Sequence, residues 1–393
     1  MKDIKPSGNS VIDNGLGRWD GTAWYPVGGG VSGIAGTSVS VRALAADNAL
    51  LYAAGFFTNA GGTTAANIAS WDGSAWSAMG SGLDYIVNAL ATDSYNFVYA
   101  GGNFTNAGGS YSRGLAVWYS GSWNNFGNVE GTNGAVNSIA YDGDSQIFIG
   151  GSFLSAGGVP ATNVAYFNHN DFSWHALGKG LNAKANSVAY GNGILYAAGS
   201  FTQAGGVSAS HVAKWDGTNW SAMGSGITGG TSVIINSVIV AGTNVYVTGN
   251  FTNAGGVSAT NIARWNGSTW SAMGSGLDIS RSGFELAASD NDIYVGGTFT
   301  LAGDKPAQFI ARWNDQLNFY PPPHPQLVRQ TSLSNRQFQF RLTGTSGESY
   351  VLQSSTNLNA WTPLFTNSTP LYDFTDTNAP KFSTRFYRAV LGP

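Results

Sequence analysis

One hexamer returns six times along this chain, and its spacing limits the folds that the chain can adopt. The copies read FTNAGG, FTNAGG, FLSAGG, FTQAGG, FTNAGG and FTLAGD, and they begin at Phe57, Phe104, Phe153, Phe201, Phe251 and Phe299. The intervals between these residues are 47, 49, 48, 50 and 48 residues. Such a period is longer than the ankyrin and tetratricopeptide repeats, and it suits one four-stranded blade of a β-propeller.

Four strand-like segments follow one another within each period. In residues 87–130 they read VNALATD, FVYAGGNF, GLAVWYS and SWNNFG. Other units carry Asp72-Gly73, Asp216-Gly217 or Asn266-Gly267 between the third and fourth segments, and such pairs favour tight hairpins. Because helical periodicity is absent over any stretch of about 10–12 residues, we expect an all-β fold.

The hexamer stands where the second strand ends and the loop to the third begins. Its glycines permit positive φ, and its Phe can pack between blades. A phosphate-binding loop is disfavoured, since no Lys regularly follows the glycines and no helix follows them. We therefore predict a turn whose Phe fills the space between neighbouring blades.

The unit resembles a kelch motif, which has a glycine pair after the second strand and then two spaced aromatic residues. Gly101-Gly102, Gly150-Gly151 and Gly296-Gly297 supply the pair, while other units keep one glycine at Gly55, Gly199 or Gly249. The aromatic pairs are Trp71 and Trp76, Trp118 and Trp123, Phe167 and Trp174, Trp215 and Trp220, and Trp265 and Trp270. The FTxAGG loop departs from kelch and is similar to repeats of bacterial secreted propellers and of the fungal cortical cell-polarity marker family. The resemblance covers about residues 15–320 and implies a fold rather than a function.

The number of blades follows from the complete units. Six full units are present, and residues 15–30 match a lone third and fourth strand. We expect six blades, with an N-terminal strand at 22–28 completing the last blade, whose own fourth segment contains prolines. The alternative is seven blades with an incomplete one at the N-terminus.

A second domain is expected after the repeats. PPPHP at 321–325 is typical of a stiff linker, so the propeller is assigned to 1–320 and a small β-sandwich to 326–393. Its runs, with Tyr350, Trp361 and the stretch Arg385–Arg388, resemble C-terminal immunoglobulin- or fibronectin-like modules of exported proteins, especially verrucomicrobial ones.

Composition excludes several classes of function. Cys is absent, so disulfides, thiolate nucleophiles and Cys-ligated metals are excluded, as is the copper chemistry of the kelch-related oxidases, which needs a Cys-modified Tyr. Only 10% of residues are charged and the net charge is −3, which does not favour nucleic acid or an anionic membrane as a partner. No apolar run reaches the length of a membrane span, and no signal peptide is visible. The composition suits an exported bacterial protein, so we expect an extracellular or cell-surface location.

Candidate binding residues lie in the loops that vary between units. In a four-stranded meander the loops b–c and d–a share one face, where variation on a constant scaffold favours binding. The candidates on this face are Tyr85, Tyr111, Arg113, Glu130, Lys184, His211 and Arg281.

A second set recurs in the innermost strand. It comprises Arg42, Asn88, Asn137, Asn186, Asn236 and Glu285. We predict that the four Asn side chains hydrogen-bond to loops of neighbouring blades, with a ring of amides around a small polar ligand or water as the alternative. Arg42 and Glu285 belong to the first and last units, and we expect them to lie close together where the ring closes.

The remaining polar groups give no catalytic pattern. His169, His175, His211 and His324 do not recur at one repeat position, and no nucleophile-elbow sequence is present. The turns at Asp142-Gly143-Asp144 and Asp290-Asn291-Asp292 are expected to be plain hairpin turns, with calcium as the alternative. The Trp pairs are expected to pack between blades rather than to stack on sugars.

The sequence therefore predicts a non-catalytic binding or adhesion module that recognises a glycan or a protein surface through the b–c/d–a face, without a cofactor or a metal. A structural spacer or self-assembling component is the alternative. An enzyme comes third, because few titratable groups are available.

Overall fold

The structure is a computed structural model, and it describes two compact units at residues 1–310 and 311–393. The described residues are 15–19, 24–35, 37–126, 131–230, 232–278, 283–289, 292–307, 309–314, 318–320, 326–332, 337–343, 349–357, 360–367, 371–382 and 384–391. The boundary between the compact units falls inside a strand, ten residues before the end of the expected propeller at 320. The expected linker at 321–325 lies outside the described residues.

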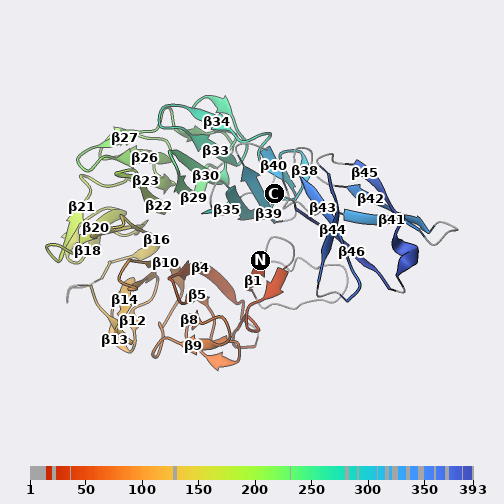
Figure 1. The fold of residues 1–393 in the computed structure, drawn as a ribbon. Helices are drawn as coiled ribbons and strands as arrows, with labels where there is room; N and C mark the ends of the chain where they lie inside the picture. The colour runs from red at the N-terminus through yellow and green to blue at the C-terminus, as the bar shows by residue number, and fades with distance from the viewer. Residues whose placement is uncertain are drawn as a thin grey trace. The chain divides into compact units, whose positions relative to one another are not determined.

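Six four-stranded antiparallel sheets follow one another along the chain, and we number them units 1 to 6 (Figure 1). The first, innermost strands are β4 (Ser40–Ala46), β10 (Val87–Thr92), β16 (Ala135–Tyr141), β22 (Ala185–Gly191), β29 (Ile234–Ala241) and β35 (Gly283–Ser289). The second strands are β5 (Leu51–Phe56), β11 (Val98–Gly102), β17 (Gln146–Ser152), β23 (Ile194–Gly199), β30 (Asn244–Asn250) and β36 (Asp292–Gly297). The third strands are β8 (Ile68–Trp71), β14 (Leu115–Tyr119), β20 (Val164–Asn168), β26 (Val212–Trp215), β33 (Ile262–Trp265) and β39 (Ile310–Asn314). The fourth strands are β9 (Trp76–Ala78), β15 (Ser122–Asn124), β21 (Ser173–Ala176), β27 (Trp220–Ala222), β34 (Trp270–Ala272) and β40 (Asn318–Tyr320).

Each hexamer begins a short hairpin between the second and third strands. The hairpins are β6–β7 (Asn59–Ala60, Thr63–Thr64), β12–β13 (Asn106–Ala107, Ser110–Tyr111), β18–β19 (Ser155–Ala156, Val159–Pro160), β24–β25 (Gln203–Ala204, Val207–Ser208), β31–β32 (Asn253–Ala254, Val257–Ser258) and β37–β38 (Leu301–Ala302, Lys305–Pro306). Two further strands, β3 (Val31–Ser32) and β28 (Ile227–Thr228), pair with β6 and β31. The predicted turn geometry is confirmed, because Gly61 and Gly62 have φ of 55° and 85°, as a two-residue hairpin of this hand requires.

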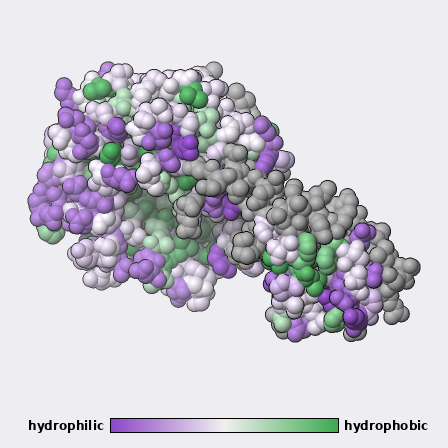
Figure 2. Space-filling model, turned by 45° about the horizontal axis from the view of Figure 1, so that its top comes forward, coloured by the Kyte–Doolittle hydropathy of each residue, from purple (hydrophilic) through white to green (hydrophobic). Residues whose placement is uncertain are grey.

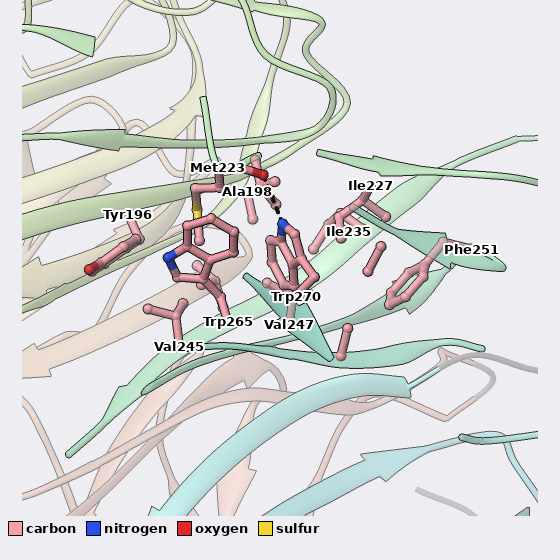
Figure 3. Packing of buried hydrophobic residues seen from close by; sticks show 14 of the residues in the cluster. Tyr196, Ala198, Met223, Ile227, Ile235, Val245, Val247, Phe251, Trp265 and Trp270 are labelled. Atoms are coloured by element: carbon pink, nitrogen blue, oxygen red, sulfur yellow. Dashed lines mark hydrogen bonds between the residues drawn. The ribbon is translucent and has the colours of Figure 1, made fainter. Parts of the chain in front are cut away.

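The repeated Phe residues form the centres of the cores between units. Phe57 and Phe153 are 2% exposed, Phe104 is 1% exposed, and Phe201, Phe251 and Phe299 are fully buried. Around Phe251, residues of unit 4 such as Tyr196 and Ala198 pack with Val247 and Trp270 of unit 5 (Figure 3). A core shared by two neighbouring sheets is the packing expected of propeller blades, and the predicted inter-blade position of the Phe is confirmed.

The units form an arc with their innermost strands toward its middle (Figure 1), and hydrophobic residues gather in the recessed middle of this part of the molecule (Figure 2). The all-β propeller fold with six full blades is confirmed. The expectation that an N-terminal strand completes the last blade is wrong. β40 supplies the fourth strand of unit 6, while β1 (Gly17–Trp19) and β2 (Trp24–Pro26) form a separate two-stranded sheet.

The second compact unit contains two three-stranded antiparallel sheets. One has the order β41 (Gln326–Ser332), β42 (Phe338–Thr343), β45 (Leu371–Asp376), and the other has the order β44 (Thr362–Asn367), β43 (Tyr350–Ser355), β46 (Phe386–Leu391). A single 3₁₀ turn, η1 (Ala379–Lys381), is the one helical element of the described residues. None of the helical segments in the described part of the chain has the length and apolar character that crossing a membrane requires.

Candidate functional site

The short hairpins and the connections from each fourth strand to the next unit form one face of the propeller, which we call the hairpin face. Each connection is bonded to the hairpins on both sides of it. Between units 1 and 2 the Leu83 N–H donates to the Ala66 carbonyl at 3.0 Å, and the Gly108 N–H donates to the Gly82 carbonyl at 2.8 Å. A Cβ on Gly82 would lie 2.3 Å from the Ala66 oxygen, so only glycine allows this approach. The same bonds recur between later units, which gives a constant backbone frame.

Two depressions lie at equivalent places on this frame, and their linings differ at several positions. Groove 1, between units 1 and 2, holds about 370 Å³ and is lined by Ala66, Ser81, Gly82, Leu83, Asp84, Asn106 and Gly109. Groove 2, between units 2 and 3, holds only about 30 Å³ and is lined by Tyr111, Arg113, Gly131, Thr132, Asn133, Ser155 and Gly158. Ala66 and Arg113 both stand nine residues after the Phe of their hexamer, at Phe57 and Phe104. The larger groove has the small residue at this position, and the smaller groove has the large one.

Asp84 fixes the wall of groove 1. Its Oδ1 accepts the backbone N–H groups of Thr105 and Asn106 at 2.8 and 3.0 Å, and its Oδ2 accepts the Asn106 amide at 2.7 Å. Partial burial opposes ionisation of this carboxyl, but the three hydrogen bonds outweigh it and hold the pKa of Asp84 below its usual range. Groove 1 thus has a rigid, negatively charged wall at neutral pH.

Three of the predicted binding residues lie beside these grooves. Tyr111 and Arg113 both line groove 2, and Tyr111 is 49% exposed. Tyr111 pairs across the hairpin with Asn106, which lines groove 1, so the hairpin β12–β13 separates the two grooves. Tyr85 follows Asp84 directly, is 50% exposed, and has an edge contact with Phe56 at 6.1 Å between ring centroids.

Two further predicted residues, Lys184 and His211, are described and line neither groove. Lys184 is exposed and belongs to the connection between units 3 and 4, where its carbonyl accepts the Ser200 N–H. His211 has φ of +68°, at the position where Asn67 and Asn261 have φ of 64° and 63°. Burial lowers the pKa of His211, which indicates a structural role in a left-handed turn. Glu130 and Arg281 lie outside the described residues.

The four Asn side chains of the innermost strands bond to the neighbouring unit, as predicted, but not to its loops. Asn88, Asn137, Asn186 and Asn236 donate to the carbonyls of Val136, Ala185, Ile235 and Gly283 at 3.2, 3.0, 2.8 and 2.8 Å. The acceptors lie in strands rather than in loops. Each Asn stands at a β-bulge, where the extra residue is free of the ladder and can reach the neighbouring sheet.

The assignment of Glu285 to this ring is wrong by one residue. The bulge of β35 lies between Gly283 and Glu285, so Phe284 holds the ring position of unit 6. Glu285 instead accepts from Ser237 at 2.8 Å, while Arg42 donates to Asn88 at 3.2 Å. Burial of the carboxyl raises the pKa of Glu285, and the hydrogen bonds from Ser237 and Leu286 only partly offset this effect. The residue as a whole still has surface exposed to solvent. No ion pair joins Arg42 to Glu285 in the described part of the structure, so the expected pair at the ring closure is absent there.

The Trp pairs pack between units and offer no exposed ring for a sugar. Trp76, Trp220 and Trp270 are 5%, 6% and 5% exposed. Four of the fourth-strand indoles, Trp76, Trp123, Trp220 and Trp270, donate to carbonyls of the preceding unit or connection, at Val27, Met79, Leu177 and Met223. Figure 3 shows the bond from Trp270 to Met223. The aromatic pairs are therefore part of the scaffold.

One cluster has the residue types of a hydrolase triad, but its geometry differs. The Ser173 hydroxyl and the Asp171 carboxylate lie 2.9 and 3.0 Å from the same atom, His175 Nε2. In a working triad the carboxylate holds one ring nitrogen and the nucleophile approaches the other.

Asp142 at the predicted turn uses its Oδ1 to accept the N–H groups of Asp144 and Ser145, as in a plain hairpin turn. Asp290 and Asn291, of the second acidic turn, and His324 lie outside the described residues.

Sequence reasoning missed the residues that make groove 1. Ala66, Asp84 and Asn106 are small or common residues, and none stands out alone. Comparing the ninth residue after each hexamer Phe would have separated Ala66 and Arg113 from Thr162, Ser210 and Thr260. That comparison points to a groove only when it is known that each hairpin lies against the connection to the next unit.

Two solved structures are among those to which this chain is similar. A designed protein called Ika8 is 13% identical, with a TM-score of 0.46, over 86% of this chain and 90% of its own. The extracellular domain of a one-component system from B. thetaiotaomicron is 10% identical, with a TM-score of 0.49, over 91% of this chain and 46% of its own. No curated protein sequence matches the chain.

The family comparison concerns the middle of the chain. Residues 74–239 match the family described as the Rax2 C-terminal beta propeller domain, which is less than half of the 393 residues. The match spans the end of unit 1 through the beginning of unit 5. The chain is therefore a β-propeller protein whose central units are similar to the propeller domain of Rax2.

Proposed function

We propose that the protein is a non-catalytic binding module, located outside the cell or on its surface, that recognises a glycan through the hairpin face. The observation that carries this proposal is the contrast between groove 1 and groove 2 on one constant frame. Because the frame repeats, the unequal side chains on it are where selectivity would arise.

The chemistry around groove 1 suits a sugar ligand. Its lining combines the Asp84 carboxylate and the Asn106 amide with the apolar surface of Ala66 and Leu83. Tyr85 and Tyr111, beside it, are half exposed and present both a ring and a hydroxyl. Amphipathic rings with a few polar groups held in place are typical of binding sites for polar ligands. A protein ligand on the same face is the other possibility, and self-assembly is the alternative to both.

Filling groove 1 tests the proposal. A glycan array screened with the full chain identifies a ligand, and Ala66→Arg then places in groove 1 the residue type that stands in groove 2. Thr162→Arg introduces the same side chain between units 3 and 4 and serves as the matched control. We expect Ala66→Arg to weaken glycan binding at least about tenfold and Thr162→Arg to leave it unchanged. No glycan binding by the full chain, or equal binding by both variants, would contradict the glycan assignment.

A further inference from the structure

The residue that ties a connection to the following hairpin differs from unit to unit. Asp84 accepts the backbone N–H groups of two hairpin residues at 2.8 and 3.0 Å. One unit later the amide oxygen of Asn133 accepts the equivalent pair at 2.7 and 3.1 Å, and Asn182 accepts the next pair, both at 2.9 Å. Because a neutral amide makes the same two bonds, the negative charge of Asp84 is not needed for the fold.

The charge of Asp84 has no counter-charge in the described part of the structure. None of the ion pairs found there involves Asp84, and residues 43–112 contain no Lys or Arg. Partial burial opposes ionisation, but the hydrogen bonds that Asp84 accepts keep its pKa below the usual range, so the carboxyl is charged at neutral pH. Asp84 is exposed and lines groove 1, where a cationic ligand can reach it.

The polar groups of groove 1 favour a ligand that donates hydrogen bonds. The backbone N–H groups of Gly82, Leu83 and Asp84 already donate to carbonyls at 3.1, 3.0 and 3.2 Å. An ionised carboxylate has about four acceptor sites, and Asp84 uses three of them, which leaves one for a ligand. The Asn106 oxygen accepts no hydrogen bond from the described residues, so groove 1 offers one charged acceptor and one neutral acceptor.

Groove 2 has the opposite polarity. At the two equivalent positions it has the Arg113 cation in place of Ala66 and the neutral Asn133 in place of Asp84. The Asn133 oxygen already accepts two backbone N–H groups, so its NH₂ group is the part that remains for a ligand. A cationic ligand would therefore favour groove 1 and be repelled at groove 2.

The size and the neighbours of groove 1 suit a sugar that carries this cation. Its volume of about 370 Å³ lies in the range of small-molecule sites. Tyr85, which follows Asp84 directly, is 50% exposed, and a tyrosine ring attracts an ammonium group as well as the apolar face of a sugar. An ammonium group supplies a positive charge and three N–H donors for the two free acceptors.

We propose that groove 1 binds an amino sugar with a free, protonated amine, and that Asp84 determines this selectivity. The inference rests on the proposed glycan-binding function and names the class of sugar within it. The ammonium group donates to the remaining acceptor site of Asp84 and to the Asn106 oxygen, beside the apolar surface of Ala66 and Leu83. N-acetylation of the sugar removes the charge and leaves one N–H, so an acetylated sugar loses the pairing with Asp84.

Asp84→Asn tests this selectivity, because asparagine already stands at the equivalent position of two other connections. Asp278→Asn is the matched control, since Asp278 accepts the same pair of backbone N–H groups at 2.9 and 3.1 Å and lines neither groove. The probes are a glucosamine tetrasaccharide and its fully N-acetylated counterpart. Titration calorimetry at low salt and about pH 6, where Asp84 is ionised and the sugar amine is protonated, compares them on the full chain.

We expect the glucosamine form to bind at least about fivefold more tightly than the N-acetylated form, and added salt to weaken only the former. Asp84→Asn should weaken binding of the glucosamine form about fivefold, whereas Asp278→Asn should leave it unchanged. The denaturant midpoint of Asp84→Asn should match that of the unaltered chain, and a clearly lower midpoint would contradict the premise that the charge is not needed for the fold.

Equal affinity for the two tetrasaccharides, or equal weakening by the two Asn variants, would overturn the inference. An array ligand whose binding is lost in Ala66→Arg but unchanged in Asp84→Asn would overturn this inference alone and leave the proposed function standing. Absence of any glycan ligand on the array would overturn both.

Discussion

The indole N–H groups between units allow a matched measurement of how much one inter-blade hydrogen bond contributes to the free energy of unfolding. Trp270 and Trp174 hold the same position in units 5 and 3, and both are 5% exposed. Trp270 Nε1 donates to the Met223 carbonyl at 2.7 Å, whereas Trp174 Nε1 is buried and has no partner among the described residues. Replacing each by Phe removes the same ring volume, so the difference between the two variants isolates the bond.

The size of that difference follows from the contacts. Trp270→Phe loses the bond, which contributes about 0.5–1.5 kcal/mol, while the Met223 carbonyl still accepts the Gly226 N–H at 3.1 Å. Trp174→Phe loses no bond and removes a buried donor that lacks a partner, so only the loss of volume remains. We therefore expect Trp270→Phe to lower the free energy of unfolding by about 0.5–1.5 kcal/mol more than Trp174→Phe.

Guanidinium unfolding followed by far-ultraviolet circular dichroism measures both variants under the same conditions. Equal slopes with denaturant would show that the two transitions expose similar surface, and the midpoints then report stability. A difference below about 0.5 kcal/mol, or a larger cost for Trp174→Phe, would refute the reasoning that these indole bonds stabilise the contact between blades.

Three further predictions concern the repeat and its pH dependence. Gly255→Ala should destabilise more than Gly256→Ala, because both have positive φ but only the first would place a Cβ 2.5 Å from Trp270, as thermal melting of the two variants can show. Asn186→Ala should cost about 1 kcal/mol through the lost bond to Ile235 at 2.8 Å, while Asn250→Ala, whose exposed amide donates to the Ser232 carbonyl at 3.0 Å, should cost less in the same assay. Burial lowers the pKa of His169 and of His211, so the unfolded chain takes up their protons first. Stability should therefore be complete above about pH 6.5 and fall as the pH is lowered from there, and His169→Gln with His211→Asn should flatten that fall in denaturant midpoints measured from pH 7 to 5.5.

The repeat made the scaffold predictable because its residues have one structural reason each. The glycines of the hexamers have positive φ. The repeated Phe and Trp side chains are large and apolar, so they pack between units. The Asn residues recur at one strand position. The error at Glu285 arose because a bulge moves the register by one residue, which spacing alone does not show. The error at the N-terminal strand arose because prolines in LNFYPPP suggested a missing fourth strand, whereas β40 ends before them.

The site was less predictable for a physical reason. Tyr111 and Arg113 were predicted because they lie in a loop that varies between units, and both line groove 2. Ala66 was not predicted, because a small side chain leaves a groove only where two hairpins and a connection surround it.

The most direct test of the account asks which face of the propeller holds the ligand. Tyr111 on the hairpin face and Tyr95 at a turn on the opposite face are 49% and 72% exposed, so neither Tyr→Ala change should disturb the fold. Titration calorimetry of both variants with the tightest ligand from the array compares the two faces. The account predicts about tenfold weaker binding for Tyr111→Ala, near 1.4 kcal/mol, and unchanged binding for Tyr95→Ala. Unchanged binding for Tyr111→Ala with weakened binding for Tyr95→Ala would place the site on the opposite face and contradict the account.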